Sequence, residues 1–195
     1  MSRKSTIHRK TNETDITVSL NLDGNGKCNA DTGIKFFDHM LSGFARHGLF
    51  DLDIKCDGDI WVDCHHTIED AGIVLGEAIC EALGEKKQIT RFGDCFLPMD
   101  ESLVLCAVDI GGRPYFVYDV NFRTEKCGDM DTQMVREFFY AMSYAARMNI
   151  HLKEMYGQND HHVMEACFKA FGRALSQACA IDERVNGIPS TKGVL

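Results

Sequence analysis

Apolar and polar residues alternate along two separate stretches of the chain. Between residues 14 and 28 (TDITVSLNLDGNGKC) nearly every second residue is apolar up to the DGNG sequence at 23–26, which predicts a strand, a tight turn and the start of a second strand. Residues 101–122 (ESLVLCAVDIGGRPYFVYDVNF) show the same alternation around the glycine pair at 111–112. We therefore expect a β-hairpin in each half of the chain.

Each predicted hairpin is followed by the same succession of patterns. Apolar residues at helical spacing predict helices over 34–48 and 132–148, and short apolar strands are expected at 49–56 and 149–156. A second helix then begins with a polar triplet in both halves, in the sequences DCHHTIED and NDHHVMEA. The triplets are His65, His66 and Glu69, and, 96 positions later, His161, His162 and Glu165.

The offset of 96 positions extends beyond the polar residues. An apolar stripe at helical spacing follows the first triplet, and adding 96 to each position gives a second apolar stripe: Ile68, Ala71, Leu75, Ala78, Ile79 and Ala82, then Met164, Cys167, Phe171, Ala174, Leu175 and Ala178. Gly76 and Gly172 also correspond. We therefore predict an α+β fold made by internal duplication of a β-sheet and two-helix unit, with pseudo-twofold symmetry and repeats at about 1–90 and 91–185. Since no flexible linker separates them, we expect one domain spanning residues 1–195.

The repeated triplets predict a metal site. On a helix, residues three and four apart share a face, so each glutamate lies beside both of its histidines. Imidazole nitrogens combined with carboxylate oxygens suit Mn, Fe, Zn or Ni ions. One triplet alone would favour a solvated helix start, but two at one offset favour ligands. His39 and Glu137 occupy the first predicted helix of their halves and are further candidate ligands.

Composition and charge narrow the range of functions. The chain has 195 residues, of which 45% are hydrophobic and 26% charged, as in an ordinary globular protein. Its net charge of -8 argues against binding of nucleic acid or anionic membrane. It has no apolar run of about 20 residues and no secretory signal pattern at its start, so we expect a cytoplasmic protein.

The cysteines and the isolated basic residues add two further expectations. The nine cysteines are odd in number and none are spaced as CxxC, which favours core packing over disulfides or thiolate ligands. His151 alternates with apolar residues and is expected to be packed. Arg91, Arg113 and Lys192 each lie near a glycine or a turn, where an anion such as phosphate can be bound.

Taken together, the motifs FFDHML, HGLFDL, DCHHTIED, RFGD, GRPY, DHHVMEACFKAFGRAL and IPSTKGVL closely resemble the imidazoleglycerol-phosphate dehydratase family of histidine biosynthesis. The resemblance covers nearly the whole chain in the right order. It implies a repeated unit of the ribosomal-S5-domain-2 type, assembled into a hollow particle of 24 identical subunits with active sites between protomers. It also implies a carbon–oxygen lyase (hydro-lyase) whose partner is a small phosphate-bearing substrate.

The resemblance also implies the roles of individual residues. A site for two manganese ions falls on His39, His65, His66, Glu69, His161, His162 and Glu165. The phosphate-binding set matches His47, Arg91, Arg113, Lys169, Ser190 and Lys192, the last two in a functional C-terminal tail. Glu13 matches a glutamate next to the glycerol carbons of the substrate. Some relatives have histidine in place of Glu137, but the internal repeat places Glu137 opposite His39, so we retain it as a ligand.

The implied reaction converts imidazole glycerol phosphate into imidazole acetol phosphate and water. It requires loss of a proton from a carbon that no carbonyl group acidifies. With a metal on each ring nitrogen, the ring can be held as an imidazolate and expel the neighbouring hydroxyl to give a diazafulvene. The candidate base for the proton is Glu13, and a metal-bound water is the alternative.

Three other functions are compatible with parts of the sequence. A metal-dependent hydrolase of phosphate esters could use the same histidines and glutamates. A metal-storage or scaffold particle would explain the triplets but not the basic residues. A nucleic-acid-binding module is suggested only by the resemblance to a ribosomal domain, and the acidic net charge argues against it.

Overall fold

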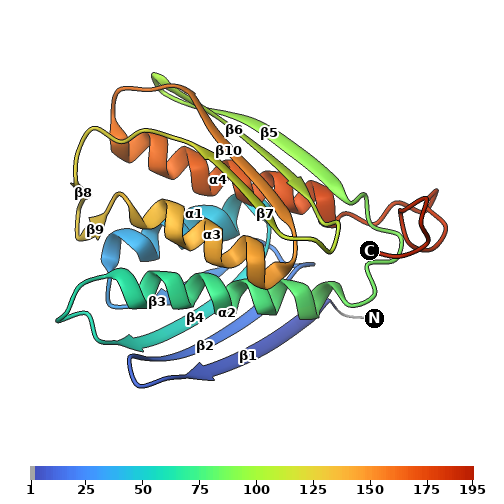
Figure 1. The fold of residues 1–195 in the computed structure, drawn as a ribbon, viewed down its shortest axis with the longest axis horizontal. Coiled ribbons are helices and arrows are strands. Elements are labelled where there is room, and N and C mark those ends of the chain that lie inside the picture. The colour runs from blue at the N-terminus through green and yellow to red at the C-terminus, as the bar shows by residue number, and fades with distance from the viewer. Residues whose placement is uncertain (1–2) are drawn as a thin grey trace.

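The computed structural model describes residues 3–195, which form two four-stranded β-sheets with the long helices between them (Figure 1). The first half contains β1 (Lys4–Lys10), β2 (Thr14–Asn21), β3 (Cys28–Asp31), α1 (Lys35–Gly48), β4 (Asp51–Gly58) and α2 (His65–Leu83). The second half contains β5 (Phe92–Met99), β6 (Ser102–Asp109), β7 (Tyr115–Asp119), β8 (Lys126–Cys127), β9 (Met130–Asp131), α3 (Met134–Ala146), β10 (Asn149–Tyr156) and α4 (Asp160–Cys179).

The two halves have the same topology, which confirms the predicted duplication of an α+β unit. The strands are ordered β1-β2-β4-β3 in the first sheet and β5-β6-β10-β7 in the second. In each half, three strands of the four-stranded sheet precede the first helix, and the fourth separates it from the second helix. The small β8–β9 hairpin, which precedes α3, has no counterpart in the first half.

The predicted hairpins at 14–28 and 101–122 are wrong. β2 and β3 do not pair, because β4 lies between them, antiparallel to β2 and parallel to β3. β10 separates β6 from β7 in the same way. A helix joins β3 to β4, and such a crossover places its two strands side by side in parallel. The observed hairpins are β1–β2 and β5–β6.

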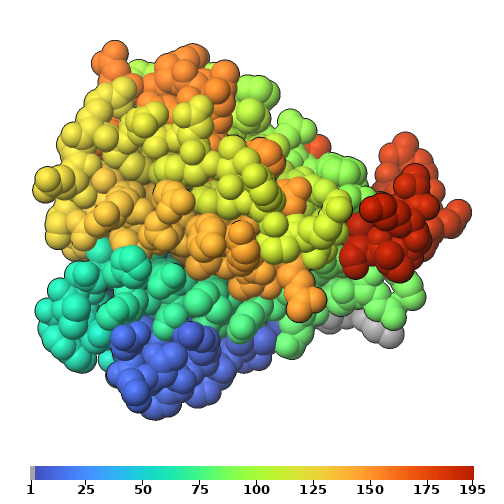
Figure 2. All heavy atoms as spheres, in the orientation of Figure 1, coloured from blue at the N-terminus to red at the C-terminus, as the bar shows by residue number. Residues whose placement is uncertain are grey.

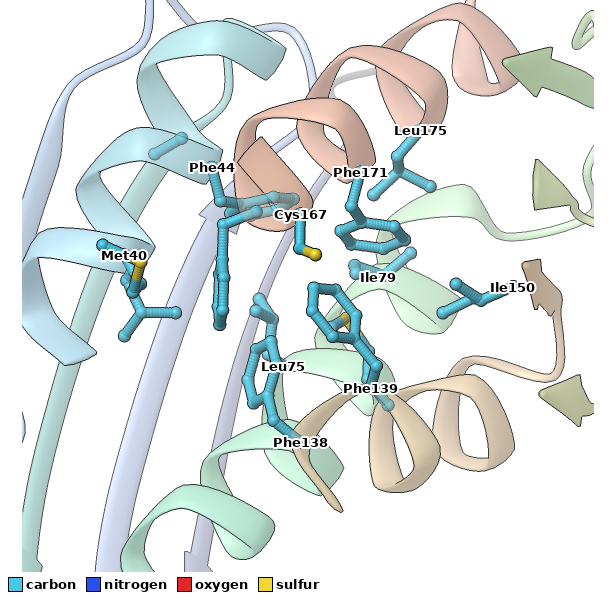
Figure 3. Packing of buried hydrophobic residues seen from close by; sticks show 14 of the residues in the cluster. Met40, Phe44, Leu75, Ile79, Phe138, Phe139, Ile150, Cys167, Phe171 and Leu175 are labelled. Carbon is cyan, nitrogen blue, oxygen red and sulfur yellow. The ribbon is translucent and has the colours of Figure 1, made fainter. Parts of the chain in front are cut away.

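The core lies between the helices and on the inner faces of both sheets. α2 packs on β1 and β2, and α4 packs on β5 and β6, while α2 also contacts α3 and α4 contacts α1. Each of these helix pairs therefore joins the two halves. Both predicted apolar stripes are buried. Rings from three helices meet in this layer: Phe44, Phe138, Phe139 and Phe171 (Figure 3).

Two glycines allow the helix pairs to approach closely. A Cβ atom at Gly172 in α4 would lie 2.5 Å from the Phe44 carbonyl oxygen of α1. A Cβ atom at Gly76 in α2 would lie 2.8 Å from the Met142 carbonyl oxygen of α3. Because these contacts are with backbone atoms, no side-chain rearrangement can relieve them. The glycines that correspond in the sequence thus perform the same task in both halves.

The outer faces of the two sheets differ in character. The outward positions of the first sheet are polar: Lys4, Thr6, His8, Thr17, Asn29, Asp53, Lys55 and Asp57. The outward positions of the second sheet include several large apolar side chains: Phe92, Phe96, Leu103, Leu105, Tyr115 and Val117. His151 lies exposed on this outer face, so the prediction that it is packed is wrong. No helix within residues 3–195 is long and apolar enough to cross a membrane.

We predict that Gly172→Ala lowers the free energy of unfolding by about 1–3 kcal/mol, because the added methyl group forces the α1–α4 crossing apart. Gly43→Ala is the matched control. Gly43 also lies in a helix, but a Cβ atom there has its nearest contact at 3.6 Å, with a flexible lysine side chain. Alanine at position 43 should leave stability unchanged or raise it. Urea unfolding of both variants measures the difference, and equal midpoints would contradict the close-crossing argument.

Candidate active site

Three predicted metal ligands come together where α1 crosses α4. His39 from α1 and His161 and Glu165 from α4 each place one ligand atom within 4.8 Å of the other two. The Nε2 atoms of His39 and His161 lie 3.7 Å and 3.3 Å from Glu165 Oε2. The Glu165 side chain is only 10% exposed, whereas the two imidazoles are about half exposed. We call these three residues the α1–α4 cluster; they form an open group of nitrogen and oxygen donors.

Side-chain hydrogen bonds fix the start of both helices that carry the α1–α4 cluster. Asn159 caps α4, since its side chain accepts a hydrogen bond from the His161 amide. The first amides of α1, from Lys35 and Phe36, donate to the carboxylate of Asp129 at 2.7 Å and 2.9 Å. Asp129 belongs to the β8–β9 turn, so a segment of the second half anchors the helix of the first half that bears His39.

The pair formed by α2 and α3 repeats this arrangement. Glu137 lies 98 positions after His39, and the left-handed C-cap Arg147 of α3 lies 98 positions after the C-cap Leu49 of α1. His39 and Glu137 are therefore structurally equivalent. The Nε2 atom of His65 lies 3.7 Å from Glu69 Oε2, which corresponds to the contact of His161 with Glu165.

The second arrangement is less compact than the first. The Glu137 carboxylate accepts a hydrogen bond of 2.8 Å from Arg136. Within residues 3–195, the α1–α4 cluster is the one group of three potential ligands whose donor atoms all lie within 4.8 Å of one another. The structure thus brings His39, His161 and Glu165 together, whereas Glu137 lies in the equivalent position without closing on His65 and Glu69.

The second histidine of each triplet is held differently from the first. His66 Nδ1 lies 3.1 Å and 3.0 Å from the two carboxylate oxygens of Asp59, and His162 Nδ1 lies 2.8 Å from Glu101 Oε2. Hydrogen bonding to these carboxylates raises the pKa of both imidazoles. The Nε2 atom of His66 faces Glu13 Oε1 at 3.7 Å. The candidate base Glu13 therefore lies beside a candidate ligand.

One member of the predicted phosphate-binding set, Lys169, directly contacts the α1–α4 cluster. The Lys169 ammonium group contacts Glu165 Oε1 at 2.6 Å, one helical turn along α4. Burial opposes ionisation of Glu165, but Lys169, together with His39 and His161, holds the pKa of this carboxyl below its usual value. Burial lowers the pKa of His47, and the charge of Lys169 lowers it further. His47 itself lines a cavity with Arg173, Ser176 and Gln177, further along α4 than Lys169.

The other four members of the set lie at the opposite end of α4. Arg91 forms an ion pair with Asp109 and donates to the Pro189 carbonyl at 3.0 Å, which ties the C-terminal tail to the second sheet. Within the tail, the Lys192 amide donates to Ser190 Oγ. The backbone of Gly112, next to Arg113, approaches the terminal residue Leu195. Figure 2 shows the tail at one edge of the molecule, beyond the body formed by the sheets and helices.

Arg91 lies far from the α1–α4 cluster of its own chain. The Arg91 amide donates to the carbonyl of Ala178, which lies 17 residues beyond His161 on α4. A helical segment of this length measures roughly 25 Å. Arg91 and the tail residues around it therefore cannot bind the phosphate of a small substrate whose ring lies at the α1–α4 cluster of the same chain.

Cysteine does not contribute to these clusters. All nine cysteines are free. Burial raises the pKa of the Cys56 and Cys179 thiols to about 12, so both remain protonated near neutral pH. Cys64 directly precedes α2, and burial raises the pKa of its thiol as well. The expectation that the cysteines are not thiolate ligands is consistent with these environments.

Comparison with known proteins decides the family. The model of the imidazoleglycerol-phosphate dehydratase family matches residues 32–175. The chain belongs to this family. It is 58% identical to the imidazoleglycerol-phosphate dehydratases of Acetivibrio thermocellus and Lachnoclostridium phytofermentans, in each case over 195 residues and the full length of both chains. The predicted family membership is confirmed, and with it the hydro-lyase class and a dehydratase role in histidine biosynthesis.

Solved structures agree with this assignment. The crystal structure of the Staphylococcus aureus imidazoleglycerol-phosphate dehydratase matches with a TM-score of 0.83 and 37% identity, covering 92% of this chain and 99% of the other. The Pyrococcus furiosus enzyme, solved in complex with (S)-C348, matches with a TM-score of 0.84 and 40% identity, covering 97% and 100%. The duplicated α+β fold is therefore that of the family.

Sequence reasoning missed three carboxylates that the structure places around the candidate ligands. Glu101 and Asp129 are distant in sequence from the groups that they hold, whereas Asp59 lies in the loop seven residues before His66. One signal was available for Glu101. It directly precedes β6, as Glu13 directly precedes β2, and both pairs of positions differ by 88. An alignment of the strands, in addition to that of the helices, would have paired these two glutamates.

Proposed function

We propose that this dehydratase uses two manganese ions per active site to convert imidazole glycerol phosphate into imidazole acetol phosphate and water. The observation that supports a metal most strongly is the α1–α4 cluster, in which two imidazoles and a nearly buried carboxylate converge from two helices. Nitrogen and oxygen donors with protonated, buried thiols elsewhere fit a manganese-like ion. The equivalent residues Glu137, His65 and Glu69 provide a second set of donors.

The reaction explains why two ions are needed. A hydroxyl group must leave the carbon next to the imidazole ring, and a proton must leave the following carbon, which is not adjacent to a carbonyl. Ions bound at both ring nitrogens would supply the missing driving force, because they allow the ring to lose its N–H proton and to donate electron density toward the leaving hydroxyl. The protein must then hold the ring, remove the carbon-bound proton and orient the phosphate.

Glu13 is our candidate for the base that removes this proton. It lies in the turn between β1 and β2, with about half of its side chain exposed, and its carboxylate faces the imidazole of His66 at 3.7 Å. His66 is a candidate ligand of an ion that would bind the imidazole ring of the substrate. A base beside this ligand can reach the carbon chain attached to the substrate ring. The proton taken by Glu13 and the departing hydroxide together account for the water that is released.

We further propose that the active site is completed by neighbouring copies of the chain. The predicted phosphate-binding residues around Arg91 lie at the last turns of α4, roughly 25 Å by helix length from the α1–α4 cluster at its first turns. A second copy could supply the distant part to each site. The apolar side chains on the outer face of the second sheet, in contrast to the polar first sheet, are consistent with an assembly, for which we propose 24 identical subunits in the cytoplasm.

The first prediction concerns the dependence of activity and assembly on metal. Treatment with a chelator should reduce formation of the ketone product to below about 1% of the initial rate, and added manganese should restore it. Particle size, measured by light scattering before and after chelation, should fall if ligands from different subunits share the ions. Appearance of free phosphate in place of the ketone would favour a hydrolase. An unchanged particle size would show that the metals act in catalysis and do not hold the subunits together.

The second prediction concerns Glu137, which we propose as a ligand of one ion. Glu137→Ala should retain about one manganese ion per subunit where the unmodified protein holds about two, whereas Glu137→His should keep both. Arg136→Ala is the control, since it removes only the ion-pair partner of Glu137. Metal analysis of the purified proteins measures the content. Two ions bound to the alanine variant with unchanged affinity would exclude Glu137 as a ligand.

The third prediction concerns the tail. Lys192→Ala should raise KM roughly tenfold or more while kcat changes less, because the lysine binds a phosphate group that takes no part in bond breaking. Lys192→Arg keeps the positive charge and should restore most of the affinity. Steady-state kinetics separates the two constants. A loss of kcat equal to the loss of kcat/KM would instead assign the tail a role in stabilising the transition state.

A further inference from the structure

The second histidine of each triplet is bracketed by two carboxylates. His66 has Asp59 at Nδ1 and Glu13 at Nε2, and the contact to Nδ1 is the shorter one, 3.0 Å against 3.7 Å. His162 has Glu101 at Nδ1 and Asp100 at Nε2, at 2.8 Å and 3.6 Å. The first histidines, His65 and His161, instead contact the glutamates of their own triplets through Nε2.

We propose that Asp59 and Glu101 are positioning residues, which hold Nδ1 of His66 and of His162 as a hydrogen-bond donor and thereby leave Nε2 as the only ligand atom. In a neutral imidazole one nitrogen carries the proton and the other has the free electron pair. A carboxylate at Nδ1 keeps the proton there. The lone pair is therefore at Nε2, and the ring cannot turn without losing the hydrogen bond. This inference rests on the metal site of the proposed function.

The Glu101 carboxylate is itself held firmly. Glu101 Oε1 accepts hydrogen bonds from the amides of Gln158 and Asn159 and from the Ser102 hydroxyl, which leaves Oε2 for His162. Hydrogen bonding, to His162 above all, holds the pKa of Glu101 well below its usual value. Asp59 is buried, its backbone amide donates to the Glu13 carbonyl at 3.0 Å, and both of its carboxylate oxygens face His66. Each histidine ring is thus contacted at Nδ1 by a carboxylate whose position the surrounding chain restricts.

The two halves reach the same arrangement with residues that do not correspond. Glu13 and Glu101 occupy equivalent positions before β2 and β6, yet Glu13 faces Nε2 of its histidine and Glu101 faces Nδ1. Asp59 lies in the loop after β4, whereas Asp100 lies in the β5–β6 turn. A duplication alone would have placed equivalent residues at equivalent atoms. The arrangement, rather than the residue, is common to both halves, as expected if orientation of the ring is the property required.

The hydrogen-bond geometry distinguishes the two positions in a test. Both oxygens of Asp59 lie about equally far from His66 Nδ1, so the amide of an Asp59→Asn variant can turn its oxygen toward the ring and keep the proton at Nδ1. Glu101 has no such freedom. In Glu101→Gln the oxygen is required by the amides of residues 158 and 159, so the NH₂ group faces His162 and favours the tautomer with its proton on Nε2.

The experiment measures manganese affinity by titration of metal-free protein. We expect Asp59→Ala and Glu101→Gln to weaken the binding of one of the two ions by roughly 10–100-fold, and Asp59→Asn to have a much smaller effect on this affinity. Asp51→Ala is the matched control, because Asp51 is also a carboxylate that accepts backbone hydrogen bonds, from Asn25 and Lys27. Its loss should leave manganese affinity unchanged. Thermal unfolding of the metal-free proteins shows how much of each effect is structural.

A double-mutant cycle separates orientation of the ring from general stabilisation. If Asp59 acts through His66, adding Asp59→Ala to His66→Ala should cause no further loss of affinity. Additive losses, or equal affinity of Asp59→Ala and the unmodified protein, would overturn the inference while leaving the metal site intact. So would loss of activity at unchanged affinity, which would assign His66 and Asp59 to proton transfer. Failure of the unmodified protein to bind manganese would refute the proposed function itself, and this inference with it.

Discussion

The close crossing of helices from opposite halves is the constraint on which the rest of this structure depends. Gly172 brings α4 against the backbone of α1, and Gly76 brings α2 against α3 in the same way. Because each pair joins one half to the other, neither sheet can bury its helices without the other half. The same crossing places His39 beside His161 and Glu165. Packing of the core and assembly of the candidate ligands are thus one geometric requirement.

Charge around Glu165 shows how this packing acts on chemistry. A carboxylate this well buried would be difficult to ionise alone, yet His39, His161 and Lys169 lie near enough to favour the charged form. His39 reaches it only because α1 crosses α4, while His161 and Lys169 lie one helical turn to either side on α4 itself. The crossing therefore supplies the one interaction that the local sequence of α4 cannot provide.

The parts of this site that sequence could predict are those with a helical period. Residues on one helix face are fixed by spacing, so the triplets, both apolar stripes and the two glycines were found from the 96-residue offset. Strand order was not, because alternation identifies a strand but not its neighbours, and β4 lies between the predicted partners β2 and β3. Asp59 was missed because the loops that lead to the two second helices differ in length, so the offset of 96 gives it no counterpart. Glu101 was missed because it precedes a strand, where the offset between the halves is 88 and not 96.

The distance between Arg91 and the candidate metal ligands shows what a single copy of the chain cannot do. α4 spans the molecule, with the candidate metal ligands at its first turns and Arg91 bound near its last. A helix that must cross the whole core to pack against α1 cannot also bring its two ends together. The substrate, by contrast, is a small molecule whose ring and phosphate must be bound at once. Repetition of the chain is the simplest way to reconcile the two lengths, because the distal end of one copy can then lie against the candidate ligands of the next.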